Sequence, residues 1–322
     1  MFPKREDLTI CFAHAAYRMK ESFDALKTGI ANFEVRERAE LDRRIGEADI
    51  VVVSGMWHNA LIPNAARLKF IQSISSGTDQ YDKPALAARG VRLASAAGVN
   101  ARAVAEHAMG LILALSRRMP EARDNQAKKH WRGMIGDLAG REDELGGKTL
   151  AIVGLGRIGG RLARLAKAFD MNTIGFRANP SLGAGDADAV YGLGALKEQL
   201  PNADFVALTC PLTPETAKLI NSETLGAMRR SAYVVNVARG GCVDEAALIA
   251  ALTSGRIAGA ALDCTGPEPP LPDSRLWTLP NVLLTPHTGG ETTRYEANTI
   301  EILLENLDRL WRGEDLLRNQ IV

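Results

Sequence analysis

The feature that most constrains the fold is the glycine-rich segment GLGRIG at residues 154–159, which lies between a predicted strand and a predicted helix. Residues 149–153 form a short aliphatic run typical of a buried strand, and residues 161–169 have a helical pattern. In this setting the GxGxxG spacing predicts a dinucleotide-binding turn. Gly154 permits the tight turn, Gly156 lets the backbone approach a pyrophosphate, and Gly159 allows the helix to pack closely on the strand. The pyrophosphate is expected against the N–H groups that open the helix.

Short aliphatic runs alternate with amphipathic segments along the chain, a pattern that indicates an α/β fold with a parallel sheet. After residues 149–153, further strands are expected at 173–176, 205–209, 233–237, 259–262 and 282–285. These are enough for one doubly wound domain. The first hundred residues look like a smaller version, with strands expected at 8–12, 50–54 and 70–74. Helices or loop-helices are expected at 17–28, 59–68, 101–118 (stopped by Pro120), 193–200, 216–220, 222–228, 245–254 and 292–312, and a loop region at 124–147.

The 322 residues are enough for about two domains. We expect a dinucleotide-binding domain over residues 100–290 and a substrate domain formed by residues 1–99 and 291–322. The helix at 292–312 follows the last strand of the large domain, so it can pack back on the first domain. The predicted fold class is therefore α/β, with two Rossmann-like, doubly wound parallel-sheet domains, of which the substrate domain is discontinuous.

Charge and cysteine content narrow the function classes. Lys plus Arg number 39 against 38 for Asp plus Glu, so the net charge of +1 favours neither nucleic acid nor a membrane as partner. The four cysteines are far apart and form no CxxC pair, which argues against zinc and fits a reducing, cytoplasmic setting. The first twenty residues lack the apolar core of a signal peptide, and the longest apolar run, 108–115, is too short to span a bilayer.

Three polar side chains follow three successive predicted strands, namely Arg239, Glu268 and His287. The carboxyl ends of parallel strands meet at the edge of the sheet where ligands bind, so we expect one cleft to hold all three. An imidazole suits proton exchange with a hydroxyl or carbonyl oxygen. A guanidinium at a strand end, followed by two glycines as Arg239 is, suits two-point binding of a carboxylate. His107, by contrast, lies in an Ala-rich helix and is expected to be a packed, hydrogen-bonded core residue.

The choice of cofactor depends on the end of the strand at 173–176. NAD-binding domains usually carry an acidic residue there for the ribose hydroxyl, but this chain has Arg177. A guanidinium can pair with a 2′-phosphate, so we favour NADP over NAD. In the alternative, Arg177 is a surface cation and NAD binds with less help.

Sequence blocks along nearly the whole chain support a family resemblance. They are SGTD at 76–79, Asn100 with VAEH at 104–107, LGGKT at 145–149, GLGRIG at 154–159, PLT at 211–213 with Thr216, NVARG at 236–240, Glu268 with Pro269, and residues 281–290. On these blocks the chain resembles the D-isomer-specific 2-hydroxyacid dehydrogenases, which include glyoxylate/hydroxypyruvate reductases and phosphoglycerate dehydrogenase. The resemblance implies NAD(P)H-dependent reduction of a small 2-keto acid to the D-2-hydroxy acid, by a homodimer joined through the cofactor domain.

The resemblance also implies residue roles. His287 is the acid/base, Glu268 its carboxylate partner that stabilises the imidazolium, and Arg239 the substrate binder. The substrate is expected to contact the N–H groups of Ser76 and Gly77, as well as Asn100, Arg239 and His287. Asp263 is expected to contact the nicotinamide carboxamide. The expected cofactor-binding set is Gly154, Leu155, Gly156, Arg157, Ile158, Arg177, Pro211, Thr216, Val237, Ala238, Asp263, His287 and Gly289.

The chain departs from the family pattern at two places, and two other functions are alternatives to the proposed reduction. The family often has His before Leu-Pro, where this chain has the run Leu208-Thr209-Cys210-Pro211, and it commonly has Asp-Val-Phe where this chain has Asp263-Cys264-Thr265. Both departures affect the expected substrate fit. A formate dehydrogenase is disfavoured, because that enzyme has glutamine at the position of Glu268. A dinucleotide-sensing corepressor is the alternative from another class, although no extended tail or basic arm supports it.

Overall fold

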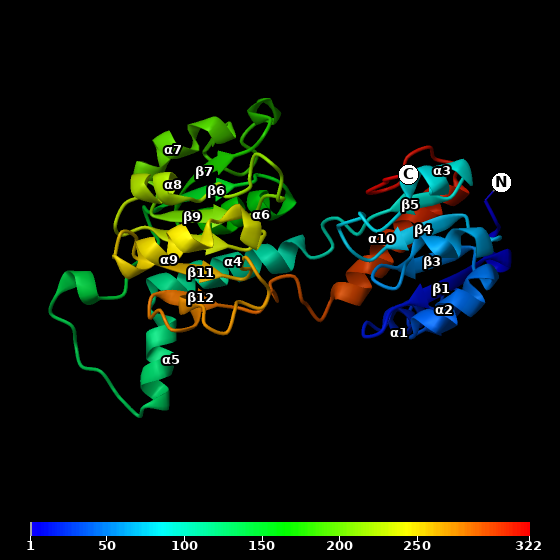
Figure 1. The fold of residues 1–322 in the computed structure, drawn as a ribbon. Helices are drawn as coiled ribbons and strands as arrows, with labels where there is room; N and C mark the ends of the chain where they lie inside the picture. The colour runs from blue at the N-terminus through cyan, green and yellow to red at the C-terminus, as the bar shows by residue number, and fades with distance from the viewer. Residues whose placement is uncertain (1) are drawn as a thin grey trace. The chain divides into compact units, whose positions relative to one another are not determined.

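The computed structural model describes residues 2–322. The chain divides into two compact units. Unit 1 consists of Met1–Asn100 and Thr292–Val322, and unit 2 of Ala101–Glu291. Each unit is an α/β structure built on its own parallel sheet, so the predicted fold class is confirmed (Figure 1).

Unit 1 contains a five-stranded sheet in the order β2-β1-β3-β4-β5, with every pair parallel. The strands are β1 (Thr9–Ala13), β2 (Ala31–Val35), β3 (Ile50–Val53), β4 (Phe70–Ser73) and β5 (Arg92–Ala94). The helices are α1 (Met19–Asp24), α2 (Arg38–Arg44), α3 (Lys83–Ala88) and α10 (Tyr295–Trp311), with 3-10 turns η1 (Arg5–Asp7), η2 (Ile45–Glu47) and η3 (Asn59–Asn64). Ile10 and Phe12 pack on one side with Ile300 of α10, while Cys11 packs in a separate cluster. Both faces of this sheet are therefore covered.

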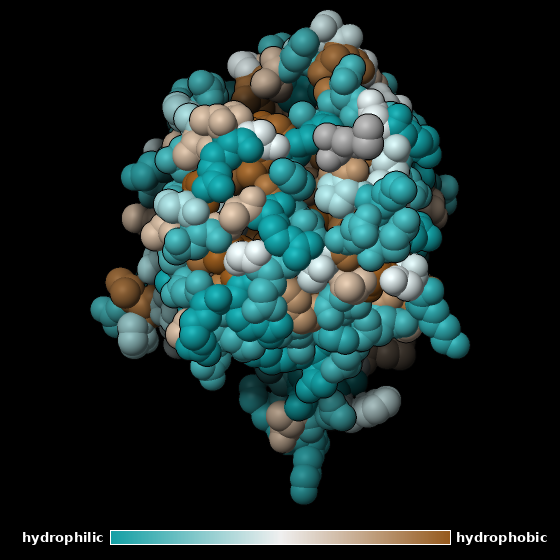
Figure 2. Space-filling model, turned by 90° about the vertical axis from the view of Figure 1, so that its right-hand side faces the viewer, coloured by the Kyte–Doolittle hydropathy of each residue, from teal (hydrophilic) through white to brown (hydrophobic). Residues whose placement is uncertain are grey.

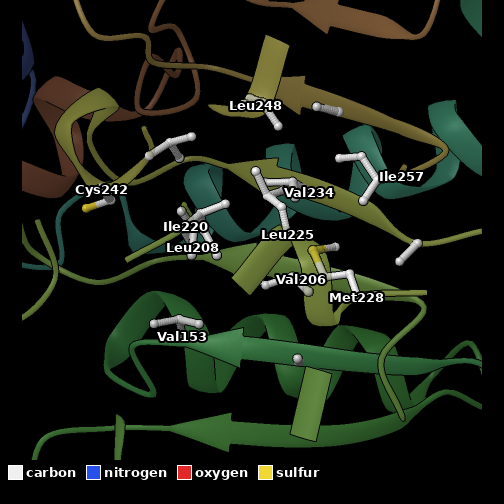
Figure 3. Packing of buried hydrophobic residues seen from close by; sticks show 14 of the residues in the cluster. Val153, Val206, Leu208, Ile220, Leu225, Met228, Val234, Cys242, Leu248 and Ile257 are labelled. Carbon is white, nitrogen blue, oxygen red and sulfur yellow. The ribbon is translucent and has the colours of Figure 1, made fainter. Parts of the chain in front are cut away.

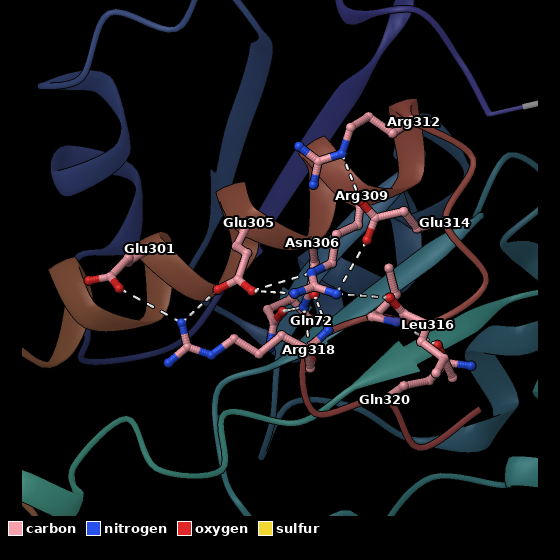
Figure 4. A network of polar contacts seen from close by, with 11 residues as sticks. Gln72, Glu301, Glu305, Asn306, Arg309, Arg312, Glu314, Leu316, Arg318 and Gln320 are labelled. Carbon is pink, nitrogen blue, oxygen red and sulfur yellow. Dashed lines mark hydrogen bonds and ion pairs between the residues drawn. The ribbon is translucent and has the colours of Figure 1, made fainter.

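A polar network ties α10 to the sheet of unit 1 (Figure 4). Asn306 is fully buried, and its amide donates to Gln72 Oε1 at 3.0 Å. Its carbonyl oxygen accepts the backbone N–H of Arg318 at 2.7 Å. At the surface of the same helix Arg318 pairs with Glu305 at 2.8 Å. The buried hydrogen bonds fix α10 against β4, because neither amide has water as an alternative partner.

Unit 2 contains a seven-stranded parallel sheet in the order β12-β11-β10-β9-β6-β7-β8. The strands are β6 (Thr149–Val153), β7 (Asn172–Phe176), β8 (Ala189–Tyr191), β9 (Phe205–Leu208), β10 (Tyr233–Asn236), β11 (Gly259–Leu262) and β12 (Val282–Leu284). The helices are α4 (Ala101–Ser116), α5 (Met119–Ala127), α6 (Arg157–Lys167), α7 (Leu196–Gln199), α8 (Ser222–Ala227) and α9 (Glu245–Thr253). The 3-10 turns are η4 (Leu138–Gly140), η5 (Pro180–Leu182), η6 (Leu193–Ala195), η7 (Leu200–Asn202), η8 (Gly240–Cys242) and η9 (Arg275–Trp277).

The strand order of unit 2 reverses between β6 and β9. From β6 the chain proceeds to β7 and β8 on one side, then returns to β9 and continues to β12 on the other. Ligands of doubly wound sheets bind at the carboxyl ends of the strands beside such a reversal. On one face, Val153, Val206 and Val234 from three strands pack against Leu225 and Leu248 (Figure 3). This core holds the strand ends in register.

The strands that the sequence pattern failed to predict are β2, β5 and β8, and all three are edge strands. An edge strand needs less apolar surface than a central one, so its pattern is weaker. Two helix expectations were wrong. Pro120 does not end a helix but lies in the first turn of α5, so the expected loop at 124–147 begins with helix. Residues 216–220 form a turn, in which Lys218 has φ 48° and Ile220 bridges to Val243.

The side drawn in Figure 2 carries mainly hydrophilic residues, with hydrophobic residues in small separate patches. Some large apolar side chains are nevertheless exposed in unit 2, and the most exposed of them are Trp131 and Met134. No helix within residues 2–322 is long and apolar enough to cross a membrane.

Candidate active site

The glycine-rich turn after β6 lies at the reversal of strand order. Gly154 has φ 102°, and a Cβ there would come within 2.6 Å of the Cys210 backbone. A Cβ on Gly159 would come within 2.3 Å of the Gly154 carbonyl oxygen. Both positions therefore require glycine for protein packing alone. A Cβ on Gly156 would meet no protein atom within 4 Å, so packing imposes no such requirement there.

The same turn has the features of an anion-binding helix start. Gly156 is the N-cap of α6, and no side chain caps that helix end. Amide groups at an uncapped helix start attract phosphate oxygens. The lack of a Cβ at Gly156 leaves the backbone approachable from that side. The residues present therefore fit the pyrophosphate of a dinucleotide.

Arg177 follows β7 directly, beside this turn. The carbonyl oxygen of Phe176 accepts the Gly154 N–H at 2.8 Å, so the end of β7 and the turn are joined. The Arg177 guanidinium donates to the Gly183 carbonyl oxygen at 3.1 Å and remains partly exposed. It lies where a doubly wound domain binds the adenosine ribose.

The loop after β9 holds two of the expected cofactor residues. Thr216 is buried, and its hydroxyl donates to the Pro211 carbonyl oxygen at 2.7 Å. The Thr213 N–H donates to the same hydroxyl at 2.7 Å. Thr216 therefore shapes this loop through its side chain. Val237 and Ala238, at the end of β10, are buried as well.

His287 and Glu268 form a hydrogen-bonded pair. Nδ1 of His287 lies 2.7 Å from Oε2 of Glu268, and both side chains are close to half exposed. Because Nδ1 is engaged, Nε2 is the ring nitrogen left to exchange a proton with a ligand. The backbone of His287 has φ 55°, in the left-handed region. A non-glycine residue needs support from its surroundings to hold this conformation.

Arg239 lies at the end of β10, the strand adjacent to β11. Its backbone is fixed by the buried Asn236, whose amide donates to the Arg239 carbonyl oxygen at 3.0 Å and whose oxygen accepts the Ala238 N–H at 3.0 Å. The guanidinium is exposed and donates to the Ala238 carbonyl oxygen at 2.6 Å. Burial raises the pKa of the Cys264 thiol to about 12, Glu268 adds to the rise and Arg239 opposes it. Both charges therefore act on one buried thiol.

Asp263, directly after β11, is 4% exposed. Its carboxylate accepts hydrogen bonds from the Thr285 hydroxyl at 2.6 Å and from the Thr288 and Gly289 N–H groups at 3.0 and 2.9 Å. Burial acts to raise the pKa of Asp263, but the hydrogen bonds from His107, Thr285 and Gly289 outweigh it and lower the pKa. Asp263 is therefore held as a carboxylate under the loop that carries His287.

A cavity of about 500 Å³ in unit 2 adjoins the pair. His287, Glu268 and Asp263 line it together with Trp277 and Leu284. Its lining thus joins the titratable groups to apolar side chains. Among residues 2–322, no group of three His, Cys, Asp or Glu residues is arranged to hold a metal ion.

Ser76, Gly77 and Asn100 belong to unit 1. Ser76 and Gly77 are exposed after β4, and within residues 2–322 neither N–H donates to a protein acceptor. Ser75 supports this turn by donating its hydroxyl to the Gly77 carbonyl oxygen at 2.9 Å. The two amides are therefore open to an anionic ligand.

The structure brings His287 and Glu268 into contact and places Arg239 on the adjoining strand end of the same unit. Sequence reasoning missed the roles of Asn236 and Thr285. Each is a single polar residue in an aliphatic run, in VVNV and VLLT, and a buried polar residue at a strand end usually has a specific partner. A single polar residue at the end of an aliphatic strand was therefore the sequence signal that could have identified both roles.

Comparisons with known sequences identify the family of the chain. The model of the family described as "D-isomer specific 2-hydroxyacid dehydrogenase, NAD binding domain" matches residues 109–289. The chain is 37% identical over 284 residues to D-3-phosphoglycerate dehydrogenase of Methanocaldococcus jannaschii, which covers 86% of this chain and 52% of that protein. It is 36% identical over 283 residues to glyoxylate reductase of Thermofilum pendens, which covers 86% and 82%. The chain thus spans about half the length of the curated phosphoglycerate dehydrogenases that it matches.

Solved structures resemble nearly the whole chain. The TT0316 protein from Thermus thermophilus has a TM-score of 0.78 at 33% identity, covering 98% of this chain and 100% of that one. A D-isomer specific 2-hydroxyacid dehydrogenase family protein from Aeromonas salmonicida has a TM-score of 0.82 at 27% identity, covering 98% and 99%. The two-sheet α/β architecture is therefore shared with known proteins.

Proposed function

Because the chain belongs to the D-isomer specific 2-hydroxyacid dehydrogenase family, we propose that it reduces a small 2-keto acid, such as glyoxylate or hydroxypyruvate, to the D-2-hydroxy acid. The observation that carries the proposal is the His287–Glu268 pair at 2.7 Å, on the sheet that also presents the glycine-rich turn. An acid/base and a dinucleotide site on one sheet edge are what hydride transfer to a carbonyl requires.

In this proposal each residue has a defined role. Arg239 and the Ser76 and Gly77 amides bind the substrate carboxylate. Nε2 of protonated His287 donates its proton to the carbonyl oxygen, and Glu268 stabilises the imidazolium through Nδ1. When bound, a reduced nicotinamide would supply the hydride for C2 of the keto acid. After reaction His287 is neutral, and solvent returns the proton because the side chain is half exposed.

The glycine-rich turn, the start of α6 and the ends of β9 and β10 would hold the dinucleotide, and Asp263 would be the partner of its carboxamide. We propose NADPH as the preferred reductant, because Arg177 stands where an acidic residue would repel a 2′-phosphate. Replacing Arg177 with Asp is expected to raise the KM for NADPH by about tenfold or more and the KM for NADH much less. A larger loss with NADH than with NADPH would contradict the NADP assignment.

The two units, the oligomeric state and the location of the protein are part of the same proposal. Unit 1, close to residues 1–99 and 291–322, is the substrate domain, and unit 2, close to residues 100–290, is the cofactor domain. The protein is a homodimer joined through unit 2, where α5 buries no residue and Figure 1 shows it extending away from the sheet of that unit. A cytoplasmic location suits the four buried, free thiols.

The direct test follows the absorbance of NADPH and of NADH in the presence of glyoxylate, hydroxypyruvate and a wider panel of 2-keto acids. We expect oxidation of the reduced cofactor with at least one of them. His287→Ala is expected to lower kcat by about 100-fold or more while cofactor binding, followed by fluorescence, stays within about twofold.

Two results would contradict the proposal. Tight cofactor binding without oxidation across the panel would favour a dinucleotide-sensing corepressor. Unchanged turnover in His287→Ala would show that another group supplies the proton.

A further inference from the structure

The Asp263 carboxylate has a fourth donor besides the three in the 285–289 loop. Nε2 of His107 lies 3.3 Å from Oδ1 of Asp263 and 2.9 Å from the Thr285 hydroxyl oxygen. His107 comes from α4, which packs against β11. The network therefore joins a helix to the loop that carries His287.

The hydrogen bonds define where the proton of His107 lies. Thr285 has one hydroxyl proton, and at 2.6 Å from Asp263 Oδ1 it is donated to the carboxylate. The Thr285 oxygen can then only accept from His107, so Nε2 of His107 carries a proton. His107 is thus a donor shared between Thr285 and Asp263.

The loop is packed directly on this pair. A Cβ on Gly289 would come within 2.8 Å of Asp263 Oδ2 and 3.0 Å of His107 Cδ2. The Thr288 and Gly289 N–H groups, which follow His287 in the chain, both donate to Asp263. The Asp263 carboxylate therefore supports the left-handed backbone of His287, at φ 55°, through the two residues that follow it. The position of this carboxylate in turn depends on His107.

The same network links the two places where the chain passes between the units. The first passage is at Asn100–Ala101, where α4 begins, and the second at Glu291–Thr292, just after the loop. Inside unit 2, His107 and Asp263 connect the segment after the first passage to the segment before the second.

We propose that His107 is a positioning residue for His287, acting through Thr285 and Asp263 rather than by touching substrate. The proposal rests on the proposed function for its kinetic consequence, but the geometric claim concerns this chain's own side chains. Buried charge-assisted hydrogen bonds are directional, so losing one donor lets the carboxylate and the loop shift. A displacement of about 1 Å in an acid/base is enough to lower turnover by up to about 100-fold.

The test compares His107→Leu with His107→Gln. Leu removes the donor, whereas the Gln side-chain amide reaches a similar distance from Cβ and can replace the Nε2 proton. We expect His107→Leu to lower kcat about tenfold or more with the KM for the cofactor changed less than about twofold, and His107→Gln to restore most of that loss. We also expect the rate at which diethyl pyrocarbonate modifies His287, followed by peptide mass mapping, to change in the Leu variant and return in the Gln variant.

Other outcomes are equally decisive. If His107→Leu leaves kcat and the modification rate of His287 unchanged, or if Gln fails to restore either, the proposal is overturned. If the wild type reduces no keto acid, the proposed function fails, while the modification rates still decide the positioning role. If His107→Leu does not fold, Thr285→Val removes the shared hydroxyl and is expected to change the modification rate in the same way.

Discussion

At the residue scale, Gly240 has no room for a side chain. A Cβ there would lie 1.7 Å from the Thr265 carbonyl oxygen, so β10 and β11 end in loops that touch through their main chains. Gly240→Ala must separate these loops, which carry Arg239 and Glu268. We expect it to lower the free energy of unfolding by about 3 kcal/mol and to lower activity further.

The matched control is Gly226→Ala. Gly226 lies in α8, and its Cβ would meet nothing within 4 Å. Alanine there is expected to raise stability by up to about 1 kcal/mol, because it has the better helix propensity. Urea unfolding of both variants is the measurement, and equal effects would contradict the steric account of Gly240.

Asp263 makes the stability depend on pH. Its folded pKa is lowered, because the hydrogen bonds of the loop outweigh the effect of burial. It therefore contributes stability above the unfolded pKa of about 4, and this is lost as the pH falls through the lower folded pKa. We expect the difference in unfolding free energy between wild type and Asp263→Asn to be larger at neutral pH than near pH 3. A difference that is the same at both values, or one matched by the exposed control Asp273→Asn, would count against this account.

At the element scale, α10 depends on one buried amide for its register on the first sheet. Asn306→Leu would leave Gln72 Oε1 and the Arg318 N–H without their partners. Each unsatisfied buried group costs about 1 to 3 kcal/mol, so we expect a loss of about 2 to 4 kcal/mol in the unfolding free energy of the variant. The control Ala297→Leu adds the same side chain at an exposed position of α10, and its effect is expected to be within about 0.5 kcal/mol. If Asn306→Leu proves neutral, apolar packing alone holds α10.

At the scale of the whole molecule, the segment after α5 carries the exposed apolar surface through which we expect two copies of the chain to associate. Trp131 and Met134 are 98% and 101% exposed, and Leu138 is 76% exposed. Large apolar side chains grouped in this way usually mark an interface. We expect the wild type to be a dimer by light scattering and the double variant Trp131→Ser with Met134→Ser to have half that mass. Leu182→Ser, at another exposed apolar residue, is expected to leave the mass unchanged. A monomeric wild type would refute the dimer.

The sequence alone determined what depends on neighbours in the chain. The glycine-rich turn, the central strands and the order of Arg239, Glu268 and His287 at strand ends all follow from local patterns, because backbone conformation and side-chain periodicity are set within a few residues. Edge strands β2 and β8 escaped prediction because their mostly half-exposed side chains leave a weak pattern, and β5 because it is only three residues long.

The tertiary structure decided which of these groups act together. Only strand pairing sets β10, β11 and β12 side by side, and only packing turns Nδ1 of His287 toward Glu268. The environment of His107 is likewise determined partly by local sequence and partly by tertiary structure. Its helix predicts a packed, hydrogen-bonded residue, whereas its partners Asp263 and Thr285 lie more than 150 residues away along the chain. Hydrogen bonds between such distant segments depend on how the whole sheet folds, which local sequence does not encode.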